Sequence, residues 1–143
     1  MSILAVSAGG AEFGLPAARV GAVVRPPPVT RVPFPPPGVR GLAQVRGSVL
    51  AVVDLGARLG MAGVRGPGRL VVVEGAGGGP VGILVDEVAG LLEGALDGPE
   101  AEAPPPEAVA ALPAGWLAGV AAPEPGRRVA ILDLDRVLSG EAT

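Results

Sequence analysis

Two short apolar runs that meet at a single glycine set the strongest constraint on how this chain can fold. The runs cover residues 42–45 and 48–53, and Arg46-Gly47 lies between them. Short runs rich in Val and Leu around a glycine are typical of a β-hairpin. Gly47 suits a turn position with positive φ, where a β-carbon would clash. The sequence therefore predicts a hairpin with Arg46 at its tip, in solvent.

Further Val-rich runs between glycines and prolines predict more short strands. The chain has 24 glycines and 17 prolines, a content that alone suggests low complexity. It also has 22 valines and 16 leucines, which disordered chains lack. We expect an all-β fold, with strands at residues 3–7, 12–15, 20–25, 70–74, 81–85, 91–96 and 127–134. The proline runs at 26–28 and 33–37 predict stiff connectors.

The central hairpin resembles the signature of the CheW family, the adaptors of bacterial chemosensory arrays. That family has an (Ile/Val)-(Arg/Lys)-Gly start, an Asn-Leu-Arg-Gly turn and a Val-Pro-Val-Val-Asp-Leu strand. Residues 39–41, 44–47 and 50–55 correspond to them, with Gln44 in place of the usual Asn and Ala51 in place of the usual Pro. Segments at 12–20, 29–33, 85–90, 116–120 and 132–138 are similar to further family patterns in the same order.

This resemblance spans residues 3–138 and implies an all-β fold with short helices. The family's fold consists of two small five-stranded β-barrel subdomains packed over a shared apolar core. Closing the sheets into barrels would also protect the edges of many short strands. We expect one CheW-like domain over residues 1–143, with the internal boundary between its subdomains left open.

The resemblance also implies a function and two binding surfaces. It implies a non-enzymatic scaffold in chemotaxis signal transduction, which couples receptors to a CheA-type histidine kinase of a two-component system. Val20 and Arg46 match the groove that receives the tip of a chemoreceptor hairpin. Leu70, Val71 and Val88 match the surface that faces the regulatory domain of the kinase. A CheW-like protein of a non-chemotactic system, for motility or development, is the alternative within this fold.

Asp54 raises a hypothesis from a different class of protein. The run Asp54-Leu55-Gly56-Ala57 follows an apolar strand and is similar to the Asp-Thr/Ser-Gly-Ala turn of aspartic proteases. A dimer of this chain could then bring two carboxylates together to share a proton. Leu55 replaces the hydroxyl residue of that turn, so we expect Asp54 instead to close the strand or cap the next turn.

Other acidic and glycine-rich segments give no convincing catalytic set. Asp133 and Asp135 are expected at an exposed strand end, with Asp135 capping a short helix over residues 136–139. Asp86-Glu87 would point to opposite faces of a strand. The glycine-rich run at 75–80 predicts a hairpin turn, because a phosphate-binding loop would open a helix rather than a strand.

Composition limits the remaining classes of function. The chain has no Cys and no His, and we expect no metal and no cofactor. Its net charge is −3 and its eleven arginines are scattered along the sequence, which argues against nucleic acid as a partner. Since no apolar run reaches the length of about 20 residues that spans a bilayer, we expect no direct membrane insertion. These features, with the resemblance, predict a cytoplasmic protein associated with receptor arrays at the inner face of the membrane.

Overall fold

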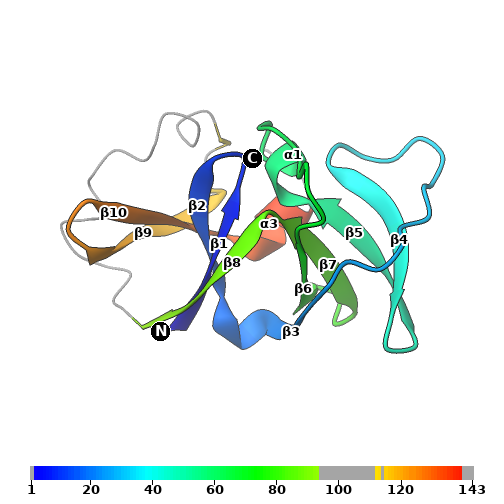
Figure 1. The fold of residues 1–143 in the computed structure, drawn as a ribbon, viewed down its shortest axis with the longest axis horizontal. Coiled ribbons are helices and arrows are strands. Elements are labelled where there is room, and N and C mark those ends of the chain that lie inside the picture. Colours follow the sequence, from blue (N-terminus) through cyan, green and yellow to red (C-terminus); the bar gives the residue numbers. More distant parts are fainter. Residues whose placement is uncertain (1, 94–111, 114, 140–143) are drawn as a thin grey trace.

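The computed structural model describes residues 2–93, 112–113 and 115–139. Within them the chain forms two five-stranded β-sheets that lie side by side (Figure 1). The first sheet has the order β8-β1-β2-β10-β9 and the second the order β3-β6-β7-β5-β4. The all-β fold with short helices is thereby confirmed.

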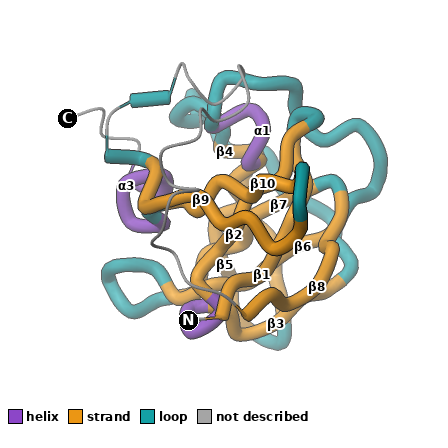
Figure 2. Tube along the Cα trace, turned by 90° about the vertical axis from the view of Figure 1, so that its left-hand side faces the viewer, coloured by secondary structure: helices purple, strands orange, loops and turns teal. Residues whose placement is uncertain are grey.

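The strand bounds follow the Val-rich runs. The first sheet contains β1 (Ser2–Ala8), β2 (Ala11–Pro16), β8 (Glu87–Glu93), β9 (Leu117–Glu124) and β10 (Arg127–Leu132). The second contains β3 (Val20–Val24), β4 (Val39–Val45), β5 (Ser48–Asp54), β6 (Arg69–Glu74) and β7 (Pro80–Val85). Three short helices, the 3-10 helix η1 (Ala17–Arg19), α1 (Leu55–Arg58) and α3 (Leu134–Ser139), lie around the periphery of the strands (Figure 2).

The two sheets have the same pattern of strand pairing, and the chain passes from the first to the second and back again. In each, a hairpin (β9–β10 or β4–β5) joins a second hairpin (β1–β2 or β6–β7) through one parallel pair of strands. The chain then leaves the hairpin β1–β2 to form β3 in the second sheet, and leaves β6–β7 to form β8 in the first. The second sheet is therefore one continuous segment, β3 to β7, inserted between the two parts of the chain that build the first sheet.

The predicted barrels are only partly closed. Within the described residues the two edge strands of each sheet do not pair with each other. In the second sheet, Thr30 spans the gap, because its backbone exchanges two 2.8 Å hydrogen bonds with Leu42 on the free edge of β4. A β-carbon on Gly41 would collide with the Thr30 carbonyl oxygen, so this close approach requires glycine there.

One apolar core lies between the sheets, as the resemblance implied. Side chains of β1 and β2 meet side chains of β6 and β7 there, and α1 and α3 add further members. Its largest fully buried members include Phe13, Leu15, Leu55 and Ile83. Two smaller clusters fill the second sheet around Leu50 and Leu70, and the first around Ile3 and Ile131. The shared core fixes how the surfaces of the two sheets are placed.

Several predicted boundaries need correction. The last strand ends at Leu132, because Asp133 caps α3 by accepting a 3.2 Å hydrogen bond from the backbone N–H of Arg136. The prediction that Asp135 is the cap is therefore wrong, since Asp135 lies in the first turn of α3. Strand β8 begins at Glu87, earlier than the predicted start at residue 91, and the predicted residues 94–96 lie outside the described chain.

Candidate partner-binding surfaces

The β4–β5 hairpin carries Arg46 at its tip, as predicted. Val45 pairs with Ser48, and the two residues between them both have positive φ, 50° for Arg46 and 84° for Gly47. Two consecutive positive φ angles define a type I′ turn, whose twist matches the twist of paired strands. The sequence indicated this backbone for Gly47 but not for Arg46. The Arg46 side chain is exposed and makes no ion pair within the described part of the chain.

Val20 lies at the start of β3 and is half-buried, where it packs against the shared core. It lines a shallow groove with Arg19, Val72, Glu74 and other residues of η1, β6 and the following turn. Arg19 donates to the carbonyl oxygen of Glu74 at 2.6 Å and forms a 2.7 Å ion pair with Asp135. This ion pair ties α3 to the end of the second sheet next to Val20.

The structure places Val20 and Arg46 on different edges of the second sheet. β3 is one edge strand, whereas Arg46 ends β4 at the other edge. Both residues belong to the same half of the molecule. A patch that includes both would have to extend across that half.

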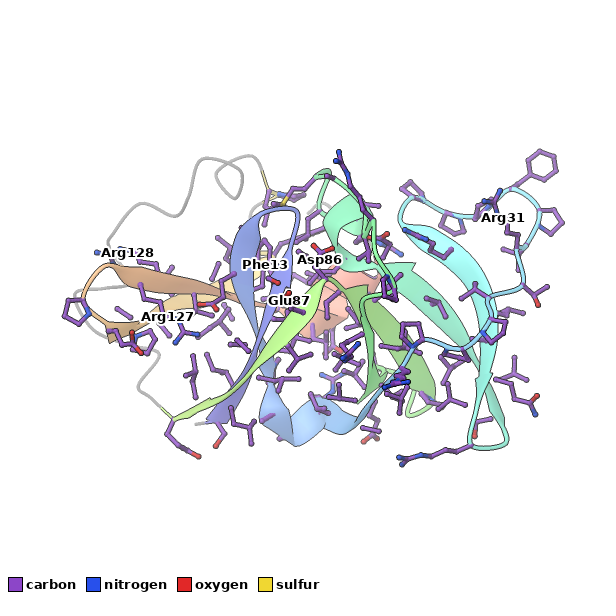
Figure 3. All side chains as sticks on the ribbon, in the orientation of Figure 1. Phe13, Arg31, Asp86, Glu87, Arg127 and Arg128 are labelled. Carbon is purple, nitrogen blue, oxygen red and sulfur yellow. The ribbon has the colours of Figure 1, made fainter. Side chains whose placement is uncertain are left out.

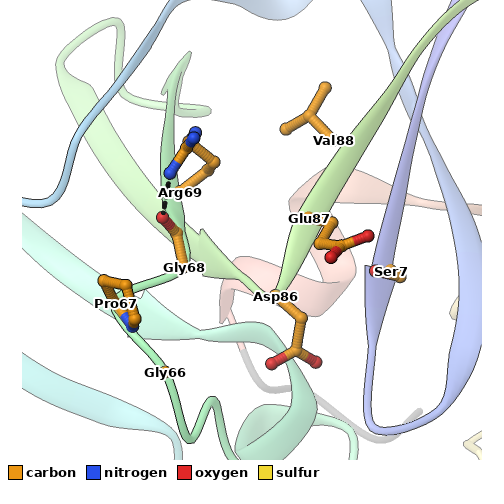
Figure 4. A pocket seen from close by; sticks show the side chains of 8 residues that line it. All are labelled: Ser7, Gly66, Pro67, Gly68, Arg69, Asp86, Glu87 and Val88. Carbon is orange, nitrogen blue, oxygen red and sulfur yellow. Dashed lines mark hydrogen bonds between the residues drawn. The ribbon is translucent and has the colours of Figure 1, made fainter.

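Val88 lies on β8 in a polar groove between the two sheets. Ser7, Arg69, Asp86 and Glu87 line this groove together with the loop at residues 66–68 (Figure 4). Arg69 donates a 2.9 Å hydrogen bond to the carbonyl oxygen of its neighbour Gly68. Among the ion pairs of the described residues, none joins Arg69 to Asp86. Partly buried Val88 is the apolar member of an otherwise polar, open surface.

Leu70 and Val71 have no exposed side-chain surface. Both are 0% exposed, with Leu70 in the core of the second sheet and Val71 in the shared core. Their side chains therefore cannot touch a partner in this structure. Both belong to β6, whose first residue, Arg69, lines the groove around Val88, and Val71 shares its core with Val88.

Asp54 is buried at the end of β5, where several hydrogen bonds hold its carboxylate. Its carboxylate is 1% exposed and caps α1 by accepting a 3.2 Å hydrogen bond from the backbone N–H of Ala57. Its other oxygen accepts bonds from Arg40 at 2.7 and 3.1 Å and from the Val64 N–H at 3.0 Å. Arg40 also donates to the Val64 carbonyl oxygen at 2.9 Å. The expected role, closing the strand and capping the next turn, is confirmed.

In the described part of the chain, the acidic residues near the end of β10 serve separate contacts. Asp133 caps α3 and Asp135 pairs with Arg19, so the two carboxylates serve different contacts. Across residues 2–93 and 115–139, no group of three or more acidic residues is placed to hold a metal ion. None of the described helices is long and apolar enough to cross a membrane.

The structure groups charges that are scattered along the sequence. Residues 17–85, which build the second sheet, contain eight arginines and two carboxylates, a net charge of +6. The other residues that the structure describes contain three arginines and seven carboxylates, a net charge of −4. Arg31 in the second half and Arg128 in the first half lie at opposite ends of the molecule (Figure 3). The sequence analysis missed this division. Summing the charges separately for the residues of each sheet would have revealed it.

The sequence analysis also missed several exposed apolar side chains. Phe34 is 99% exposed in the proline-rich loop, and Leu42 and Val49 are 41% and 66% exposed on the central hairpin. Leu91, on β8 of the acidic half, is 67% exposed. The alternation along β4 could have indicated this exposure. Neighbouring side chains of a strand point to opposite faces, so Leu42 points outward where Ala43 is buried.

The fold agrees with one known family. The family model for the CheW-like domain matches residues 2–142, and the chain therefore belongs to the CheW-like domain family. Among solved structures, the chain is similar to the scaffolding protein TtCheW from Thermoanaerobacter tengcongensis, with a TM-score of 0.79 and 26% sequence identity. That similarity covers 99% of this chain and 96% of the other. No curated protein sequence matches the chain.

Proposed function

We propose that this chain is a scaffold of a bacterial chemosensory array that couples chemoreceptors to a CheA-type histidine kinase. The observation that carries the proposal is membership of the CheW-like domain family over residues 2–142, together with the similarity to a scaffolding protein along nearly the whole chain. In this proposal residues 1–143 act as one CheW-like domain, and its two sheets are the two subdomains. The protein works at the cytoplasmic side of receptor arrays.

Such a coupler needs two separate surfaces, and the structure offers two candidates. Arg46 projects from the tip of the second sheet, and we assign this tip, with Val20 in the same half, to the tip of a chemoreceptor hairpin. We assign the groove around Val88 to the regulatory domain of the kinase, with Leu70 and Val71 beneath it as support. Because the shared core joins both sheets, a partner that favours one arrangement of the sheets changes affinity at the other surface.

Binding measurements on both partners test this proposal. Isothermal titration would compare wild type, Arg46→Ala and Val88→Thr against a receptor cytoplasmic fragment and a CheA-type regulatory domain. We expect Arg46→Ala to weaken receptor binding by about tenfold and to leave the kinase affinity unchanged. Val88→Thr keeps the branched shape of the side chain. It should weaken binding to the regulatory domain of the kinase and leave receptor binding unchanged.

Arg128→Ala in the opposite half is the matched control for Arg46→Ala. Equal affinity of wild type and Arg46→Ala for the receptor would refute the assignment of the hairpin tip. Failure of wild type to bind either partner would refute the coupling function. Binding to partners from a motility or developmental pathway, but not to those of chemotaxis, would favour the non-chemotactic alternative. The network around Asp54 gives the aspartic hydrolase hypothesis no support.

A further inference from the structure

An uncharged apolar loop stands out from the second sheet just before β4. Between Arg31 and Arg40 the sequence has no charged residue, and residues 33–37 are all exposed. Four of these five residues are prolines, and the fifth is Phe34, whose side chain is 99% exposed. We call residues 33–37 the proline loop. It presents a continuous apolar surface to whatever lies outside the protein.

The proline loop is held at both ends by the body of the second sheet. On one side, the backbone of Thr30 exchanges its two hydrogen bonds with Leu42. On the other, the Gly38 carbonyl oxygen accepts a 2.7 Å hydrogen bond from the N–H of Asp54. Gly38 also lies so close to the backbone of Arg58 that a β-carbon there would collide with it. These anchors fix where the loop projects.

The backbone of Phe34 is strained. Its φ is 49°, a region that residues with a β-carbon rarely adopt. Because the ring is 99% exposed, packing within the described chain does not offset this strain. Strained residues that the fold itself does not need are concentrated at binding sites. The strain therefore points to a contact of the ring with something outside the protein.

The bend at Phe34 also limits what that contact can be. A groove that reads proline-rich ligands accepts a continuous polyproline II helix, in which every φ is near −75°. The φ of 49° at Phe34 interrupts such a helix in the middle of the proline loop. The loop thus offers one ring at a bend, and a polyproline-reading domain is a poor match for it.

The backbone of the proline loop is suited to a surface that is poor in water. Proline has no N–H, so four of the five residues bring no backbone donor that would lose its hydrogen bond to water. An unpaired donor is a large part of the cost of moving a loop out of water. The proline loop can therefore enter the boundary between lipid headgroups and acyl chains at low cost.

Arginines flank the proline loop on both sides. Arg31 and Arg40 line one groove together with Pro35. Arg31 forms no ion pair within the residues that the structure describes, and the side chain of Arg40 is 45% exposed. Arg31 and Arg128 of the acidic half lie at opposite ends of the molecule (Figure 3). An anionic surface therefore attracts the end that carries the proline loop and repels the other.

We propose that the proline loop is a peripheral membrane contact, which inserts Phe34 among the headgroups of an anionic lipid bilayer while Arg31 and Arg40 bind lipid phosphates. This inference goes beyond the proposed function, because it needs neither the receptor nor the kinase. The sequence argument against membrane insertion concerned the length that spans a bilayer, which a loop at headgroup depth does not need. One ring with a few cations gives a reversible contact rather than a permanent anchor.

Sedimentation with lipid vesicles tests the contact. One set of vesicles contains phosphatidylcholine with phosphatidylglycerol, and the other contains phosphatidylcholine alone. The variants are Phe34→Asn, since asparagine accepts a positive φ, and Arg31→Ala. Their matched controls are Leu91→Asn and Arg128→Ala, which remove an exposed apolar side chain and an exposed arginine from the acidic half. Circular dichroism checks that each variant is folded.

We expect wild type to bind the anionic vesicles and to bind phosphatidylcholine alone at least tenfold more weakly. Phe34→Asn should lose about tenfold in affinity for the anionic vesicles, and Arg31→Ala about fivefold. Each control should change the affinity less than about twofold. Wild type that ignores the anionic vesicles would overturn the inference, and so would equal binding by wild type and Phe34→Asn.

Phe34→Trp reports directly whether the ring enters the lipid. The chain has one tryptophan, Trp116, which is 5% exposed, so vesicles should change chiefly the emission of the introduced indole. We expect this variant to bind as wild type does and its emission to shift to the blue with anionic vesicles. Binding without any blue shift would mean that only the arginines touch the surface, which would overturn insertion of the ring.

The titrations with the receptor fragment and the regulatory domain separate this inference from the proposed function. Phe34→Asn should bind both protein partners as wild type does. If wild type ignores vesicles and Phe34→Asn weakens either protein partner, the proline loop belongs to a protein interface, and the inference is overturned while the proposed function stands. If wild type binds vesicles through Phe34 but binds neither protein partner, the inference stands and the proposed function falls.

Discussion

Replacing Asp54 by asparagine is the sharpest test of how the central hairpin is held. The substitution keeps the shape of the side chain and removes its charge. One carboxylate oxygen now accepts three hydrogen bonds, from two nitrogens of Arg40 and from the Val64 N–H. In asparagine, an NH₂ group must take the place of one of the two oxygens, so it faces donors in either orientation of the amide.

The size of the effect follows from burial. Breaking a buried ion pair by removing one partner destabilises a protein by about 3–5 kcal/mol. Arg40 is 45% exposed and can turn partly to water, which lowers that figure, whereas the Asp54 side chain is 2% exposed. The buried backbone N–H of Val64, left without an acceptor, would cost about 1–3 kcal/mol, and that of exposed Ala57 less. We therefore expect a loss of about 3 kcal/mol, equal to a fall in Tm of about 10 °C.

Chemical denaturation followed by circular dichroism measures the loss. The matched control is Asp135→Asn, which removes a carboxylate that is 52% exposed and pairs with Arg19, and which should cost less than about 1 kcal/mol. Equal unfolding free energies for wild type and Asp54→Asn would refute the structural role. Acid-dependent proteolysis by wild type that Asp54→Asn abolishes would revive the hydrolase hypothesis.

Two further substitutions test local features of the fold. Phe34→Asn should raise the unfolding free energy by about 0.5–1 kcal/mol, since Phe34 is 99% exposed and has a φ of 49°, which asparagine adopts more readily. A loss of stability in the same denaturation assay would mean that Phe34 packs against the protein. Glu12→Gln should cost about 0.5–1 kcal/mol, because Glu12 holds Arg127 by two bonds of 2.7 and 3.0 Å across the short parallel pair β2–β10. The difference from wild type should shrink in 1 M salt, and a difference that salt leaves unchanged would contradict an ionic origin.

The local elements could be predicted because their signals lie within a few residues. The hairpin turn at Arg46-Gly47 and the glycine turn between β6 and β7 follow from glycine and from apolar runs on both sides. The role of Asp54 was foreseen for the same reason, since its capping bond reaches only to Ala57. Its partners Arg40 and Val64 were not foreseen, because they are 14 and 10 residues away along the chain.

The pairing of strands between halves could not be predicted in this way. β3 follows β2 but pairs with β6, and β8 follows β7 but pairs with β1. The second sheet is one continuous segment, β3 to β7, whereas the first sheet combines strands from both ends of the chain, and no signal within a few residues marks these two crossings. Burial at Leu70 and Val71 likewise depends on what packs against them. A valine-rich strand looks the same in sequence whether one face or both faces are covered.

The way the chain is divided between the two sheets also explains why charge was hard to interpret from the sequence. Arginines that are spread over residues 19–69 come together because five strands from that part of the chain build one sheet with its neighbouring loops. A net charge of −3 for the chain therefore hides a basic half and an acidic half, whose fields act on partners separately. An acidic partner approaching the β4–β5 hairpin meets the basic half first, so its association rate should fall with added salt. The association rate of a partner that approaches β9 and β10 should depend differently on salt. This difference would distinguish binding at the two halves even where the equilibrium affinities are equal.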